Sequence, residues 1–245
     1  IFVIPVEAME RVEDHLVRLR AVFDQPQTYL QVVEEDSIPH RSWVDAQRVD
    51  DSKTAFVRAR AAHWHASGRE LNDVRRLYLA AIGAAPLDPE PLAGLILVNS
   101  MMLYSRPELL GEVSRAVSRM DVIGAAGPGP DAARAALALS RGNRLEATRL
   151  TEACASIDGL CGMIHGLSTL NASAVRTSAG VLNDTRLALG MTAEAALGAQ
   201  DWAELTAAID KILALDRRDL RAWELRAEQE AALGRWENAR AAADK

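Results

Sequence analysis

Apolar residues recur at helical spacing along most of the chain, most regularly near its C-terminus. One stripe there has intervals of three or four residues, which define one face of an α-helix: Trp202, Leu205, Ile209, Ile212 and Leu215. Many of the glycines and prolines fall between such stretches, where they mark turns. The pattern predicts a series of helices joined by short connections.

Two stretches near the C-terminus align without gaps at an offset of 34 residues. Trp202 aligns with Trp236, and Leu189 aligns with Trp223. The alignment extends over two helices and the turn between them, where the second copy has Gly234. A whole helix-turn-helix unit is therefore predicted to repeat, and internal repeats of this size indicate a solenoid.

The period resembles that of the tetratricopeptide repeat (TPR) family. In this family the first helix of a pair has a large residue near its start and a small one four positions on, and Trp223 and Ala227 match them. Arg217 stands where the family usually has a closing proline. The resemblance is clearest over residues 186–245 and 54–86. It implies an all-α, TPR-like α-solenoid of antiparallel helix pairs, wound into a right-handed superhelix.

The rest of the chain departs from the repeat. Residues 1–52 are predicted to form a helical N-terminal cap, including a helix over residues 27–35, because end repeats must hide an apolar face. Residues 53–157 are predicted to be degenerate TPR-like repeats. Residues 158–180 are poor in charge and rich in Gly, Ser and Thr, which predicts an irregular insertion with one short helix followed by a loop. The C-terminal TPR repeats then occupy residues 181–245.

Charge argues against a nucleic-acid partner. The chain has 28 Lys and Arg against 34 Asp and Glu, a net charge of −6, and the two signs are interleaved. A surface that follows a phosphate backbone needs a basic stripe instead. No nucleic-acid partner is therefore expected.

The cellular compartment stays open. No apolar run is long enough to span a membrane, and no signal peptide is recognisable. The chain begins at Ile1 rather than at an initiator methionine, which leaves open that it is cut from a longer polypeptide. A cytoplasmic location is preferred, with a membrane-tethered or periplasmic one as the alternative.

Two cysteines are too few for a disulfide framework. In one continuous helix Cys154 and Cys161 would lie roughly 10 Å apart, too far for a disulfide, although a break at Gly159 could bring them together. Two buried free thiols are the preferred interpretation.

Two histidines flank a tryptophan in the first repeat. On a helix, His63 and His65 project about 200° from each other and cannot bind one metal ion as an i, i+4 pair can. The repeat register instead places Trp64 in the core, His65 on the concave face and His63 in solvent.

No catalytic, cofactor-binding or metal-binding residue is predicted. The chain lacks a Gly-rich strand-to-helix elbow around a nucleophile and a phosphate-binding glycine loop. Gly159, Gly162 and Gly166 lack the spacing of a dinucleotide fingerprint and are interpreted as a small-residue packing face. We therefore expect a chain that is not an enzyme.

The TPR resemblance implies a concave groove, lined by the first helices, that binds a peptide or a partner helix. The residues expected to line it are Leu187, Met191, Glu194, Arg221, Glu224, Glu228 and His65. They do not supply the Lys, Asn and Arg set of the family's carboxylate clamp, so a chaperone C-terminal tail is not the expected guest.

The preferred function is a non-enzymatic scaffold for protein-protein interaction. The Arg- and Ala-rich composition is typical of bacteria, so a subunit or assembly factor of a larger bacterial complex is expected. The alternative is a substrate-guiding helical-repeat region of a larger enzyme, such as a glycosyltransferase.

Overall fold

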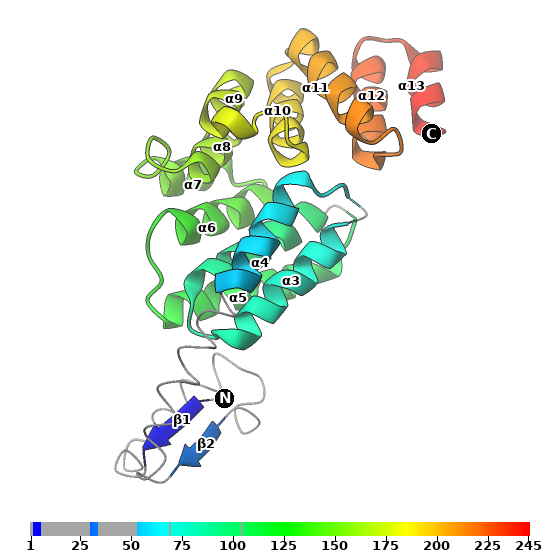
Figure 1. Ribbon diagram of the computed structural model, residues 1–245. Coiled ribbons are helices and arrows are strands. Elements are labelled where there is room, and N and C mark those ends of the chain that lie inside the picture. The colour runs from blue at the N-terminus through cyan, green and yellow to red at the C-terminus, as the bar shows by residue number, and fades with distance from the viewer. Residues whose placement is uncertain (1, 6–29, 34–52, 69, 104) are drawn as a thin grey trace.

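The computed structural model describes residues 2–5, 30–33, 53–68, 70–103 and 105–245. Helices and short turns make up the described chain from residue 53 onward (Figure 1), which confirms the predicted all-α class. The helices are one over residues 53–65, α3 (Leu71–Ala84), α4 (Pro89–Met102), the 3-10 turn η4 (Pro107–Leu109), α5 (Leu110–Val122), α6 (Pro128–Ser140), α7 (Arg144–Thr151), α8 (Gly159–Ser168), α9 (Ala172–Ala179), the 3-10 turn η5 (Gly180–Leu182), α10 (Arg186–Ala199), α11 (Trp202–Leu215), α12 (Leu220–Ala232) and α13 (Trp236–Ala243).

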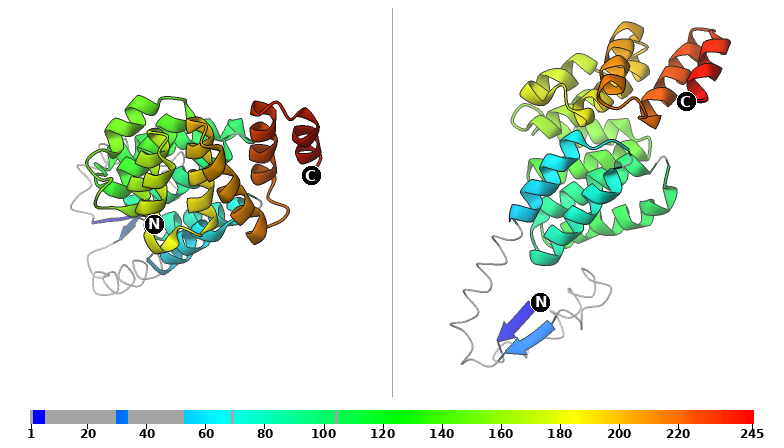
Figure 2. Two further views of the ribbon diagram at one scale, coloured as in Figure 1. Left: turned by 90° about the horizontal axis from the view of Figure 1, so that it is seen from above. Right: turned by 45° about the vertical axis from the view of Figure 1, so that its right-hand side comes forward.

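Alternate helices stack on one another, as in an α-solenoid. From α4 to α13, each even-numbered helix packs against the odd-numbered helix that follows it, and α4, α6, α8, α10 and α12 also contact one another in sequence. We call these five helices the first-helix layer. The C-terminal pairs, yellow to red, continue the row beyond the pairs drawn cyan to green (Figures 1 and 2). The handedness of the superhelix stays a prediction.

The 34-residue period recurs in the helix boundaries. The helices α10 and α12 begin at Arg186 and Leu220, and α11 and α13 begin at Trp202 and Trp236, so each pair of starts is 34 residues apart. The turns correspond as well, because Gln200 and Gly234 both have positive φ, of 58° and 73°. The last two helix pairs therefore repeat in backbone conformation as well as in sequence.

Short polar side chains begin many of these helices. An N-cap side chain satisfies a backbone N–H that has no partner within the helix. Six such caps accept a backbone N–H at 2.8 to 3.1 Å: Asp88, Asn143, Asp158, Asn171, Asp201 and Asp219. The first of them precedes Pro89 at the first helical position of α4, where the missing N–H of proline costs no hydrogen bond.

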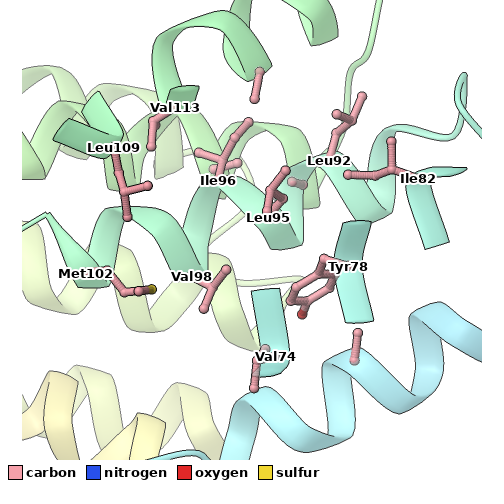
Figure 3. Close-up of a cluster of buried hydrophobic side chains, with 14 of the residues drawn as sticks. Val74, Tyr78, Ile82, Leu92, Leu95, Ile96, Val98, Met102, Leu109 and Val113 are labelled. Atoms are coloured by element: carbon pink, nitrogen blue, oxygen red, sulfur yellow. The ribbon is translucent and has the colours of Figure 1, made fainter. Parts of the chain in front are cut away.

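The core is divided among three neighbouring clusters. Figure 3 shows the first, where buried side chains of α3, α4 and α5 meet, among them Tyr78, Leu92 and Ile96. The second lies among α8 to α12, and partly buried Trp64 packs against it. The end of helix 53–65 therefore reaches residues that are more than one hundred positions away in sequence.

The segment over residues 158–180 is a helix pair, not an irregular insertion. Its two helices, α8 and α9, pack against each other. A Cβ atom on Gly162 would overlap the side chain of Ser178, and one on Gly166 would lie 2.8 Å from Val175 Cγ2. The glycines therefore form the predicted packing face, and the low charge reflects close helix contact. The loop predicted after α8 is wrong.

Two short strands replace part of the predicted N-terminal helical cap. Strands β1 (Phe2–Pro5) and β2 (Leu30–Val33) pair in parallel, with Phe2 opposite Leu30. The helix expected over residues 27–35 is wrong at these four positions, where adjacent valines favour a strand. Residues 1, 6–29 and 34–52 of the cap lie outside the described residues.

The two cysteines form a disulfide, so the expectation of free thiols is wrong. The helix α7 ends at Thr151 and α8 begins at Gly159, and the turns between them bring the Cα atoms of Cys154 and Cys161 to 5.9 Å. This separation is typical of disulfides. The break in the helix, which the sequence left as the alternative, is what brings the cysteines together.

Candidate functional site

One face of α10 connects a cavity to a cluster of charges. Leu187, Met191 and Glu194 are spaced by four and then three residues, so they project from one side of the helix. Leu187 is buried and lines the cavity, while Met191 is half-buried. Glu194 forms an ion pair with Arg221 of α12 at 2.7 Å. Leu187 is therefore part of the hydrophobic core as well as a residue of the predicted groove.

The cavity has a volume of about 400 Å³ and lies where helix 53–65 faces the first-helix layer. This volume is within the range of sites for small ligands. Its lining comes from the helix over residues 53–65 (Phe56, Arg60, His63, Trp64), α3 (Tyr78), α4 (Glu90, Ala93, Gly94, Leu97), α6 (Pro128, Gly129), the start of α8 (Asp158, Leu160) and α10 (Leu187).

Two half-buried carboxylates give the cavity its negative charge. Glu90 lies in the first turn of α4, and Asp158 is the N-cap of α8. Burial raises the pKa of Glu90; Arg60 acts in the opposite direction, while Asp88 and Asp158 add to the rise. The cation of the lining, Arg60, is exposed. The fixed charges in the half-buried part of the wall are therefore negative.

His63 is buried against α3 and α4 rather than solvated, so its predicted position is wrong. Its Nδ1 lies 3.3 Å from the hydroxyl of Tyr78, and its Nε2 lies 3.3 Å from the sulfur of Met101. Burial lowers the pKa of His63 to about 4, so the imidazole is neutral at neutral pH. The repeat register placed Trp64 in the core, and in the structure its side chain is half-buried.

The buried imidazole predicts a loss of stability in acid. The folded-state pKa of His63 lies below the ordinary value of 6.5. The contribution of the neutral imidazole to the free energy of unfolding is therefore complete above pH 6.5 and is lost as the pH falls toward 4. Between pH 7 and pH 4.5 we expect the free energy of unfolding to fall about 2 to 3 kcal/mol further than in His63→Gln.

Urea unfolding of both proteins at the two pH values measures this difference, because the contributions of the carboxylates are common to both. His65→Gln is the matched control, since His65 is exposed, and it should follow the parent protein. Equal pH dependence in His63→Gln and the parent would contradict the assignment.

The second half of the predicted groove is an ion-pair cluster around Arg221. Its guanidinium pairs with Glu194 of α10 at 2.7 Å, and with Glu224 and Glu228 of its own helix at 3.1 and 2.9 Å. Three carboxylates around one guanidinium leave negative charge in excess. Four of the predicted groove residues are thus gathered at one place, at least partly accessible to solvent.

The remaining predicted groove residue, His65, is exposed and does not line the cavity. Among the described residues, no group of His, Cys, Asp and Glu has the arrangement to hold a metal ion. No helix among them has the length and apolar character to cross a membrane.

The sequence did not identify the residues that give the cavity its charge. Glu90 and Asp158 each stand at a helix start, where an acidic residue already has a structural explanation. One feature of the sequence could have indicated their proximity. Both residues stand at the start of a first helix, and the starts of first helices lie along the same edge of a solenoid. To predict that Glu90 and Asp158 lie close together, residues 158–180 would have had to be recognised as another helix pair of the solenoid.

Comparisons with models of protein families, with curated proteins and with solved structures each found no match. The helix-pair architecture rests on the structure itself. Membership of the TPR family stays a hypothesis, supported by the 34-residue period.

Proposed function

We propose that this chain is a TPR-type scaffold that binds a peptide or a partner helix along its first-helix layer, with no catalytic step of its own. The observation that carries the proposal is the continuous face from the cavity through Leu187 and Met191 to the charges around Arg221. Grooves with apolar anchor points and charged rims bind helical or extended segments. Assembly of a larger bacterial complex is the role that we propose for such binding.

A charge-reversal experiment tests the groove. Peptides are first selected from a random library against the intact chain, and their Kd values are then measured by fluorescence anisotropy. We expect the double variant Glu224→Lys/Glu228→Lys to change Kd at least fivefold, weakening basic peptides and strengthening acidic ones. Both glutamates are exposed, so the free energy of unfolding should change little.

The matched control is Glu152→Lys/Glu237→Lys, which reverses the same number of charges at two exposed positions outside the first-helix layer. It should leave Kd within twofold of the parent value. The groove is not the binding surface if both double variants bind alike, or if only the control changes Kd.

A further inference from the structure

Among the described residues, the carboxylates of the 400 Å³ cavity lack the ion-pair partners that the charges of a second cavity have, although the charge of Arg60 acts on Glu90. That cavity, of about 360 Å³, lies among α9, α10 and α11. Its charged residues form ion pairs, Arg176 with Glu204 at 3.0 Å and Lys211 with Asp184 at 2.6 Å. Within the described part of the chain, neither carboxylate of the 400 Å³ cavity forms such an ion pair.

Each carboxylate is held in place by the fold. Asp158 Oδ1 accepts the backbone N–H of Cys161 at 2.8 Å, and no described residue donates to its second oxygen. The carboxylate of Glu90 lies against the first turn of α6, where a Cβ atom on Gly129 would come within 2.9 Å of both oxygens. Glycine at this position therefore leaves room for the Glu90 carboxylate.

The rest of the wall suits the apolar part of a ligand. Trp64, Leu97, Leu160 and Leu187 come from four different helices and line the same cavity. An indole ring attracts a cation placed over its face, and leucines favour an aliphatic stem. Because Arg60 is exposed, its flexible side chain can turn into water when a cation enters.

We propose that this cavity binds an organic cation, an ammonium or guanidinium group on an aliphatic stem, between Glu90 and Asp158. Its source is a lysine or arginine side chain of the partner segment, and this identification of the source rests on the proposed groove function. The excess of carboxylates around Arg221 favours a basic segment at the other end of the same face.

Two sets of probes test separately whether the cavity binds an organic cation and whether that cation is a side chain of a peptide. The first probes are n-butylguanidinium and n-butylammonium, with butyrate as the anionic control. Their binding is measured by Trp fluorescence and by amide chemical shifts. The second are a capped twelve-residue amphipathic peptide with one central arginine and the same peptide with norleucine there. We expect both cations to bind and butyrate not to bind, and the arginine peptide to bind at least fivefold tighter than the norleucine peptide.

Three substitutions locate the site. Glu90→Gln and Asp158→Asn should each weaken butylguanidinium at least fivefold, and asparagine keeps the N-cap. Gly129→Ala should weaken it as well, because the new methyl group displaces the Glu90 carboxylate without changing any charge. Glu152→Gln, at an exposed position after α7, should leave Kd unchanged. Thermal melts of the four variants check that each one is folded.

Each outcome bears on one of the two proposals. Equal binding of butyrate and butylguanidinium, or unchanged Kd in both Glu90→Gln and Asp158→Asn, overturns the cation site even if peptides still bind along α10 and α12. Binding of the small cations with no preference for the arginine peptide supports the cation site and overturns its peptide source. The ligand is then a small organic cation and not a side chain of a peptide.

Discussion

Replacing Asp219 with alanine is expected to lower the free energy of unfolding by about 4 kcal/mol. The Asp219 side chain is 1% exposed, and its carboxylate accepts hydrogen bonds from Nε and Nη2 of Arg186 at 2.5 and 3.0 Å. It also accepts the backbone N–H of Ala222 and so caps α12. The substitution leaves Arg186, whose side chain is 10% exposed, without its counter-charge, and it removes the cap. Urea unfolding at pH 7 measures the loss.

Two variants separate the contributions. Asp219→Asn keeps an acceptor for the cap while removing the charge, so its loss should be smaller than that of alanine. Asp184→Ala removes a carboxylate that is 71% exposed and pairs with Lys211, and exposed pairs contribute about 1 kcal/mol or less. Similar losses for Asp219→Ala and Asp184→Ala would show that burial of the pair does not matter.

This buried pair illustrates which features the sequence could predict. The repeat predicted a first helix that opens near Trp223, and α12 begins three residues earlier, at Leu220. An aspartate before a helix is already explained as an N-cap. Arg186 lies 33 positions earlier, at the start of the preceding first helix. Contact between them depends on how closely two repeats stack, which local periodicity does not specify.

The candidate site was predictable only in its C-terminal half. There the two clear repeats fixed the helical register, and the predicted groove positions Glu194 and Arg221 do contact each other. In the N-terminal half His63 was assigned incorrectly, since it is buried rather than in solvent. An alanine-rich helix has apolar residues on several faces, so its pattern distinguishes these two orientations poorly.

The tryptophans show a second limit of the pattern. Trp202 and Trp236 occupy equivalent positions at the start of α11 and α13, yet the first is half-buried and the second is 71% exposed. Gln229 of α12 donates to the backbone carbonyl of Trp202 at 3.0 Å, so the following repeat covers the first tryptophan. Burial of a repeat position thus depends on the neighbouring pair as well as on its own residue.

Replacing Gly94 with alanine is expected to lower the free energy of unfolding by about 2 to 3 kcal/mol. A Cβ atom on Gly94 would overlap ring carbons of Tyr78, which is 2% exposed. The ring has little room to move, because its centroid lies 5.8 Å from that of His63 and 6.3 Å from that of Phe56. The overlap should exceed the gain of about 1 kcal/mol that alanine brings to a helix.

Gly83→Ala is the matched control, since a Cβ atom on that helical glycine would have no neighbour within 4 Å. Alanine there should stabilise the protein by about 0.5 to 1 kcal/mol. Tyr78→Leu completes the comparison, because without the ring Gly94→Ala should destabilise the protein much less. Matching effects at the two glycines in urea unfolding would mean that α3 and α4 are farther apart than described. Tyr78 and Gly94 both line the 400 Å³ cavity, so the same measurement tests one wall of the proposed binding site.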